Sequence, residues 1–315
     1  MKKDDGLLAL KMNSKEKKNI KNSYSFASTA AYFFIAPALL AILIFFFIPV
    51  IAAFFISFTD FDIYALGNFN TVRFVGINNY IRLFEDPLFW LSLKNTSYYV
   101  ILATPLSIAV SLGAAMLLNS KLLKYKSIFR LSYFMPYVTT LVAVAIVWRF
   151  IYHPKFGILN YFLGLVGINP IDWLGDPNWA MPAIVIMSVW KSFGYSMIIF
   201  IAGLQNIPED LYEAASLEGA NEWQKFKSIT LPLLAPTTLF ISIITIVGYF
   251  QLFAEPYIMT QGGPLNSTLS IVQYMYQEGF RWWNMGYSAS IAFVLFFIIL
   301  IITMIQFKVQ KITSK

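Results

Sequence analysis

A polar stripe interrupts one of the apolar segments of the sequence and offers a set of side chains for binding chemistry. Its members recur at helical spacing, so a helix would place them on one face: Ser188, Lys191, Ser192 and Tyr195. A weaker stripe in a later apolar segment consists of Thr245, Tyr249 and Leu252. Hydroxyl and ammonium groups form hydrogen bonds with polar solutes, and aromatic rings stack on apolar faces. We interpret both stripes as a substrate path; the alternative is helix packing, which also uses Ser and Thr.

The sequence contains few of the residue types that catalysis and metal binding require. His153 is the single histidine and cysteine is absent, which excludes thiolate zinc sites, iron–sulfur clusters and haem held by several protein ligands in the membrane. None of the glycines is followed by lysine, so the chain has no phosphate-binding loop of the Walker A type. We therefore expect no enzymatic activity, no metal site and no cofactor held by this chain.

The composition indicates a protein that lies in a membrane. Of its 315 residues, 58% are hydrophobic and 12% are charged, whereas soluble domains carry about 25% charged residues. Six apolar segments are long enough to cross the hydrocarbon layer, which takes about 18 or more residues in a helix. They lie at about 31–58, 96–118, 131–148, 180–204, 233–253 and 286–306. The prediction is an all-α, multi-pass protein in which a transmembrane domain (31–306) separates an N-terminal tail (1–30) from a C-terminal tail (307–315).

The distribution of basic residues predicts the orientation of these segments. The two tails and the loops on their side hold 16 Lys and Arg residues, against 6 in the alternate loops, so both termini should be cytoplasmic. This topology accounts for the formal charge of +7 without a nucleic-acid partner. Lys191 is the only charge within a predicted span, and at the bilayer centre it would cost about 2.5–3.5 kcal/mol, so it should face a protein interior or an aqueous cavity.

The predicted cytoplasmic loop 205–230 departs from the charge rule, because it contains more acidic than basic residues. Pro208 suits the first turn of a short helix that should extend to Leu217 or Glu218, and Gly219 suits the left-handed turn after it. A second short helix should follow from about 221 to 228. On spacing alone, the loop could equally be an ordinary pair of interfacial helices.

The full string of the loop resembles a specific family motif. The residues concerned are Glu213-Ala214-Ala215, Gly219-Ala220, Gln224, Phe226 and Ile229-Thr230-Leu231-Pro232. They closely resemble the "EAA" loop of the permease subunits in binding-protein-dependent ATP-binding-cassette importers. The family usually has Asp before the glycine, where this chain has Glu218, so the charge is kept.

Further motifs resemble the first permease subunit of maltose-type carbohydrate importers. They are Phe74-Val-Gly-Ile-Asn-Asn-Tyr80, Asp86, Phe89-Trp90, Asn95-Thr96, Met135-Pro136, Trp148, Gly157-Ile-Leu-Asn160, Trp190, Ala202-Gly-Leu-Gln-Asn-Ile-Pro208, Thr260-Gln-Gly-Gly-Pro264 and Thr268. The chain looks like a six-helix version without the additional N-terminal spans and the large external insertion of some maltose permeases.

The resemblance implies a multi-pass permease of the bacterial cytoplasmic (inner) membrane that imports carbohydrates, with di- and oligosaccharides as typical substrates. The implied partners are a second homologous permease, an ATPase dimer that binds ATP-Mg, an external solute-binding protein and membrane lipid. The coupling residues it implies are Glu213, Ala214, Ala215, Glu218, Gly219 and Ala220. The rival interpretation is a self-sufficient secondary carrier or channel. Such carriers usually need carboxylates inside the membrane, and the six predicted spans contain no Asp or Glu.

Overall fold

A computed structural model describes residues 32–120 and 123–313 of the chain. These residues are helical apart from turns, loops and one isolated bridge between Thr59 and Phe74, and no strand occurs among them. The predicted N-terminal tail (1–30) lies outside the described residues. The helical architecture agrees with the predicted all-α class.

The described part divides into two units, and the first contains a single long helix, Tyr32–Ile56. Within it, a π-helical turn, η1 (Leu43–Phe47), precedes α3 (Ile48–Ile56). Pro49 has no N–H to donate to the preceding turn, and a locally widened helix accommodates such a break in the hydrogen-bond ladder. No residue of η1 or α3 is buried within the chain.

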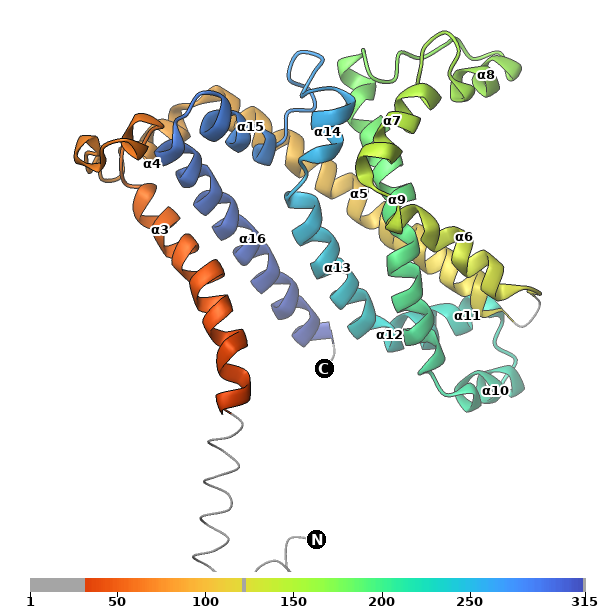
Figure 1. Ribbon diagram of the computed structural model, residues 1–315. Helices are drawn as coiled ribbons and strands as arrows, with labels where there is room; N and C mark the ends of the chain where they lie inside the picture. The colour runs from red at the N-terminus through yellow and green to blue at the C-terminus, as the bar shows by residue number, and fades with distance from the viewer. Residues whose placement is uncertain (1–31, 121–122, 314–315) are drawn as a thin grey trace, which may run out of the picture. The chain divides into compact units, whose positions relative to one another are not determined.

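The second unit (57–315) is built on two long helices that pack against each other, α5 (Pro87–Asn119) and α9 (Pro177–Gln205) (Figure 1). Both begin in the same way: an aspartate, Asp86 or Asp176, caps the helix through its side chain, and a proline occupies the first turn. Small buried residues recur along α5 at intervals of four or seven: Ser92, Thr96, Ala103, Ser107, Ser111 and Ala115. Such a stripe permits close helix packing where lipid offers no hydrophobic driving force.

Further helices cover these two. In chain order the remaining elements are η2 (Tyr64–Leu66), η3 (Phe69–Thr71), α4 (Asn78–Glu85), α6 (Lys126–Val138), α7 (Leu141–Ile151), α8 (Ile158–Leu165), α10 (Glu209–Leu217), α11 (Glu222–Lys225), η4 (Phe226–Thr230), α12 (Leu231–Leu233), α13 (Ala235–Phe250), α14 (Ala254–Met259), α15 (Ile271–Tyr276), η5 (Gln277–Arg281) and α16 (Met285–Thr313). Helix α6 packs on α9, and α13 packs on both α5 and α16. Helices α10 and α11 lie at the opposite end of α9 from α8 and α14 (Figure 1).

Four helices in the described part are long and apolar enough to cross a membrane: Tyr32–Ile56, Pro87–Asn119, Pro177–Gln205 and Met285–Gln310. The number rises to six if each of two bent helix pairs forms one span. The chain is therefore a multi-pass membrane protein with four to six candidate spans. The last helix continues through residue 313, beyond residue 306, the predicted end of the sixth span.

The structure bends the chain within two of the predicted spans, 131–148 and 233–253. Helices α6 and α7 meet at 99°, because Thr139 and Thr140 between them are extended, with ψ angles of 142° and 134°. The segment Glu222–Leu233 meets α13 at 65°. Pro236 explains the second bend, since it cannot donate a hydrogen bond to the turn before it. Apolar length indicates that a segment can cross, but not whether it crosses without a break.

Candidate functional site

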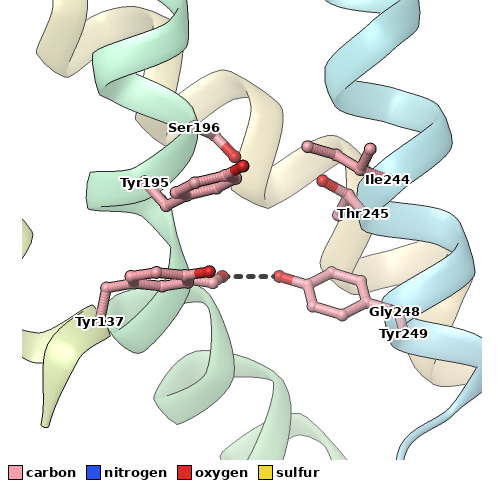
Figure 2. A pocket seen from close by; sticks show the side chains of 8 residues that line it. Tyr137, Tyr195, Ser196, Ile244, Thr245, Gly248 and Tyr249 are labelled. Carbon is pink, nitrogen blue, oxygen red and sulfur yellow. Dashed lines mark hydrogen bonds between the residues drawn. The ribbon is translucent and has the colours of Figure 1, made fainter. Parts of the chain in front are cut away.

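A cavity of 360 Å³ lies between α9, α13 and the end of α6 (Figure 2). Its lining residues are Tyr137, Ser192, Tyr195, Ser196, Ile244, Thr245, Gly248 and Tyr249. Tyr195 and Ser196 come from α9, and Thr245 and Tyr249 face them from α13. The Ser192 and Tyr249 hydroxyls are 2.9 Å apart, so a hydrogen bond closes the space between the two helices. The lining combines hydroxyl groups with aromatic faces and contains no charged side chain.

Four of the seven residues predicted for a substrate path line this cavity: Ser192, Tyr195, Thr245 and Tyr249. The other three lie elsewhere. Ser188 and Leu252 are buried, with 4% and 3% of their surfaces exposed, and Leu252 belongs to the hydrophobic core. The ammonium of Lys191 donates to the backbone carbonyl of Tyr137 over 3.1 Å. The predicted face of α9 is thus divided between the lining of this cavity and helix packing.

The structure adds residues that the spacing did not indicate. Tyr137, at the end of α6, stacks on Tyr195 with ring centroids 4.8 Å apart and planes inclined by 16° (Figure 2). Glu255, in α14, is partly buried just beyond the end of α13. Burial raises the pKa of Glu255, and the positive charge of Lys191 opposes this effect. The local sequence gives no sign that an acidic residue after a predicted span is partly buried. For this reason the sequence does not indicate Glu255 as a site residue.

The loop after α9 folds into the two short helices that the sequence predicted, α10 and α11. Helix α10 ends in a Schellman motif: the Ala220 amide donates to Ala215 and the Gly219 amide to Ser216. Gly219 has a φ of +84°, a conformation that disfavours any residue with a Cβ atom. Asn221 and Gln224 then form a reciprocal capping box at the start of α11. Local hydrogen bonds thus define the turn between the two helices.

The predicted coupling residues lie on two sides of α10. One groove of 530 Å³ contains Ala214, Ala215, Glu218, Gly219 and Ala220 in its lining. Glu213 lines a different groove of 660 Å³, together with Tyr212 and the end of α9. The side chain of Leu217 protrudes from the helix with 90% of its surface exposed. An exposed, slim helix with an apolar tip is suited to insertion into a cleft of another protein.

A polar cluster connects three helices at the end of the unit that contains α14 and α15. Asp86 accepts hydrogen bonds from the Tyr274 hydroxyl, from the Tyr287 hydroxyl at 2.7 Å and from the Leu88 amide at 2.8 Å. Arg82 lies over the Tyr287 ring, 4.4 Å from its centroid. Burial raises the pKa of Asp86, but these hydrogen bonds outweigh it and hold the pKa below its usual range. An ionised Asp86 thus joins α5 to α15 and α16.

Within the described residues, no group of three or more His, Asp or Glu side chains could hold a metal ion. Neither the cavity lining nor the α10 grooves contain a histidine. The described residues thus present two hydroxylated helix faces around a cavity and a protruding helical loop.

Comparison with known proteins identifies relatives of this chain. The family model for "Binding-protein-dependent transport system inner membrane component" matches residues 107–312. The arabinooligosaccharides transport system permease protein AraP of Bacillus subtilis (strain 168) is 38% identical over 283 residues, covering 89% of this chain and 88% of its own. The lactose transport system permease protein LacF of Rhizobium radiobacter is 36% identical, covering 88% and 92%. The trehalose/maltose transport system permease protein MalF of Thermococcus litoralis is 34% identical, covering 89% and 93%.

A solved structure has the same fold. It is a chain of a bacterial ABC transporter involved in the import of the acidic polysaccharide alginate, with a TM-score of 0.77 and 22% identity. The match covers 96% of this chain and 100% of the other. A second structure of an alginate ABC transporter, in complex with an alginate pentasaccharide-bound periplasmic protein, has a TM-score of 0.76 and 21% identity.

Proposed function

The chain belongs to the family of binding-protein-dependent transport system inner membrane components, and from this membership we propose that it is a permease subunit of an ATP-binding-cassette importer for carbohydrates. The observation that carries the proposal is the match of about nine-tenths of the chain to permeases of oligosaccharide and disaccharide transport systems. Proteins in this family are transport components, so the chain is not itself an enzyme.

Loop 205–230 is the proposed docking element for a separate ATPase dimer that binds ATP-Mg. Its exposed helix α10 and the groove beside Gly219 support this role. In this arrangement, closure of the ATPase dimer is transmitted to the spans by six residues of the loop: Glu213, Ala214, Ala215, Glu218, Gly219 and Ala220. The loop and both termini are then cytoplasmic, and all six predicted spans cross the bacterial inner membrane, two of them as bent pairs.

The cavity between α9 and α13 is the proposed part of the sugar path in this subunit. Its hydroxyl groups provide donors and acceptors for sugar hydroxyls, and the faces of Tyr137 and Tyr195 suit the apolar faces of sugar rings. The lack of charged residues in the lining favours a neutral sugar. A homologous second permease would complete the path, and an external solute-binding protein would deliver the sugar.

Reconstitution tests the proposal against a self-sufficient carrier or channel. The full chain is expressed with and without the proposed ATPase, second permease and solute-binding protein, and uptake of arabinotriose, lactose and maltose is measured in vesicles. We expect vanadate-sensitive uptake of at least one sugar only when all subunits are present. Uptake by the chain alone would contradict the proposal.

A further inference from the structure

The break between α6 and α7 leaves the carboxyl end of α6 exposed within a predicted span. The last carbonyl groups of a helix lack partners in the next turn. The Thr139 hydroxyl and amide both donate to the carbonyl of Met135, at 3.0 and 3.3 Å. The chain then turns away, and α7 continues at 99° to α6. The carbonyl of Tyr137 therefore needs a donor from outside α6, because an unpaired backbone group in hydrocarbon is costly.

Lys191 supplies this donor from the neighbouring helix α9. Its ammonium nitrogen lies 3.1 Å from the Tyr137 carbonyl oxygen. A cation at the carboxyl end of a helix is also favoured by the helix dipole. The two helices can approach because Gly194 lies one turn further along α9, where an added Cβ atom would come within 2.0 Å of the Tyr133 carbonyl oxygen. Lys191 and Gly194 together fix the end of α6 against α9.

The same contact positions an aromatic wall of the cavity. The Lys191 ammonium lies 5.6 Å from the centroid of the Tyr137 ring, within the range of a cation–π interaction. Tyr195 forms the second part of this aromatic wall, and its ring is stacked on the ring of Tyr137. Both tyrosines line the cavity, whereas Lys191 does not.

We propose that Lys191 is a positioning residue: by capping the end of α6 it holds Tyr137 parallel to Tyr195, and the two rings select the sugar. The significance for transport rests on the proposed function, but the positioning itself does not. This assignment revises the interpretation of Lys191 as a residue that touches the substrate.

A double-mutant cycle on uptake tests whether Lys191 acts through Tyr137. Lys191→Met, Tyr137→Ala and the double variant are made in the full transporter, and uptake is measured with whichever of arabinotriose, lactose and maltose the unmodified complex transports. We expect Lys191→Met to raise the KM about tenfold, as loss of a hydrogen bond to a charged group suggests, with little change in Vmax. In the Tyr137→Ala background the same substitution should have almost no further effect.

Two controls accompany the cycle. Lys191→Arg keeps a cationic donor and should preserve most of the affinity, while Lys94→Met removes an exposed lysine from α5 and should leave the KM unchanged. If Lys191→Met raises the KM equally in the presence and absence of the Tyr137 ring, Lys191 acts directly on the sugar and the proposal is wrong.

A labelling experiment tests the positioning without transport. Because the chain contains no cysteine, a single Thr140→Cys substitution in the bend can be labelled selectively by a water-soluble maleimide in native membranes. We expect Lys191→Met to change the labelling rate several-fold, and Lys191→Arg to restore it. An unchanged rate would overturn the positioning role even if uptake is observed. Absence of uptake in the unmodified complex would instead count against the proposed function alone.

Discussion

The hydroxyl of Tyr212 lies 2.9 Å from the hydroxyl of Thr230, and this bond connects α10 to the π-helical turn η4 that leads back into the membrane. Thr230 is 4% exposed, whereas α10 contains no buried residue. The pair therefore links an exposed helix to a buried point at the base of α13. If a partner displaces α10, this contact can transmit the displacement to the spans. It does so in addition to the peptide backbone that connects them.

Removing the Tyr212 hydroxyl should weaken this link while the ring remains. We expect Tyr212→Phe to lose one hydrogen bond of about 0.5–1.5 kcal/mol and to lower ATP-dependent uptake several-fold. The amount of chain in the membrane should not change. Initial uptake rates and immunoblots of membranes measure both quantities. Tyr64→Phe, which alters a tyrosine that is 80% exposed far from the loop in sequence, is the control; equal rates in both variants would contradict the link.

The turn after α10 should tolerate no proline. Gly219→Pro would force φ to about −65° from +84° and remove the amide that donates to Ser216. We expect normal insertion but no ATP-dependent uptake. Gly167→Pro imposes a comparable change at a glycine with φ of +76° outside the loop, so it serves as the matched control. If both variants transport equally well or equally poorly, the effect is not specific to loop 205–230.

Charge reversal at Glu213 provides a second test of the same loop. The Glu213 side chain is exposed, so Glu213→Lys should not disturb folding. We expect it to abolish uptake and co-purification of the ATPase, because a cation would replace the acid on the proposed docking surface. Pull-down of the ATPase from detergent extracts measures the interaction. Retention of the ATPase together with full uptake would show that Glu213 has no part in docking.

The hydrogen bond across the cavity should contribute to sugar affinity. Ser192→Ala and Tyr249→Phe each remove one of its two hydroxyls, so we expect either change to raise the uptake KM by a few-fold. Their effects should be non-additive by about 1 kcal/mol, because the residues are in direct contact. Ser132→Ala is the control, since its hydroxyl donates to a carbonyl of its own helix. Fully additive effects would indicate that the two hydroxyls act on the sugar separately.

The Asp86 cluster predicts a specific dependence of stability on pH. Asp86→Asn removes the charge that accepts from Tyr274 and Tyr287, and we expect a loss of about 1–3 kcal/mol in thermal unfolding in detergent. Because the folded-state pKa of Asp86 is depressed, this stabilisation is present above the unfolded value, about 3.9, and is lost as the pH falls through the folded value. The difference between the two proteins should therefore be constant from about pH 8 to 5 and shrink below about pH 4.

Asp60→Asn is the control for this comparison. Asp60 pairs with Arg73 at 2.8 Å, but the Arg73 side chain is 84% exposed, so the pair should contribute less than about 1 kcal/mol. A loss for Asp60→Asn as large as that for Asp86→Asn would show that the cluster has no special role.

Several features followed from local sequence alone. Long apolar segments predicted helices because hydrocarbon requires every backbone group to be bonded within its segment. Gly219 predicted the end of α10 because a left-handed turn needs no partner from elsewhere in the chain. Ser192 and Tyr195 were assigned to one face because helical spacing is a property of the backbone. The coupling role of the loop stays a prediction, since it depends on a partner.

Other features depended on contacts between distant segments, which no local pattern encodes. Tyr274 and Tyr287 lie 188 and 201 residues after Asp86, and only folding brings these hydroxyls to the carboxylate. The packing of α6 on α9 places Tyr137 over Tyr195 and turns Lys191 toward a backbone carbonyl. Sequence determined which faces are polar, because periodicity is local; tertiary structure alone decided which polar groups meet, because a helix face can point to a cavity, a neighbouring helix or lipid.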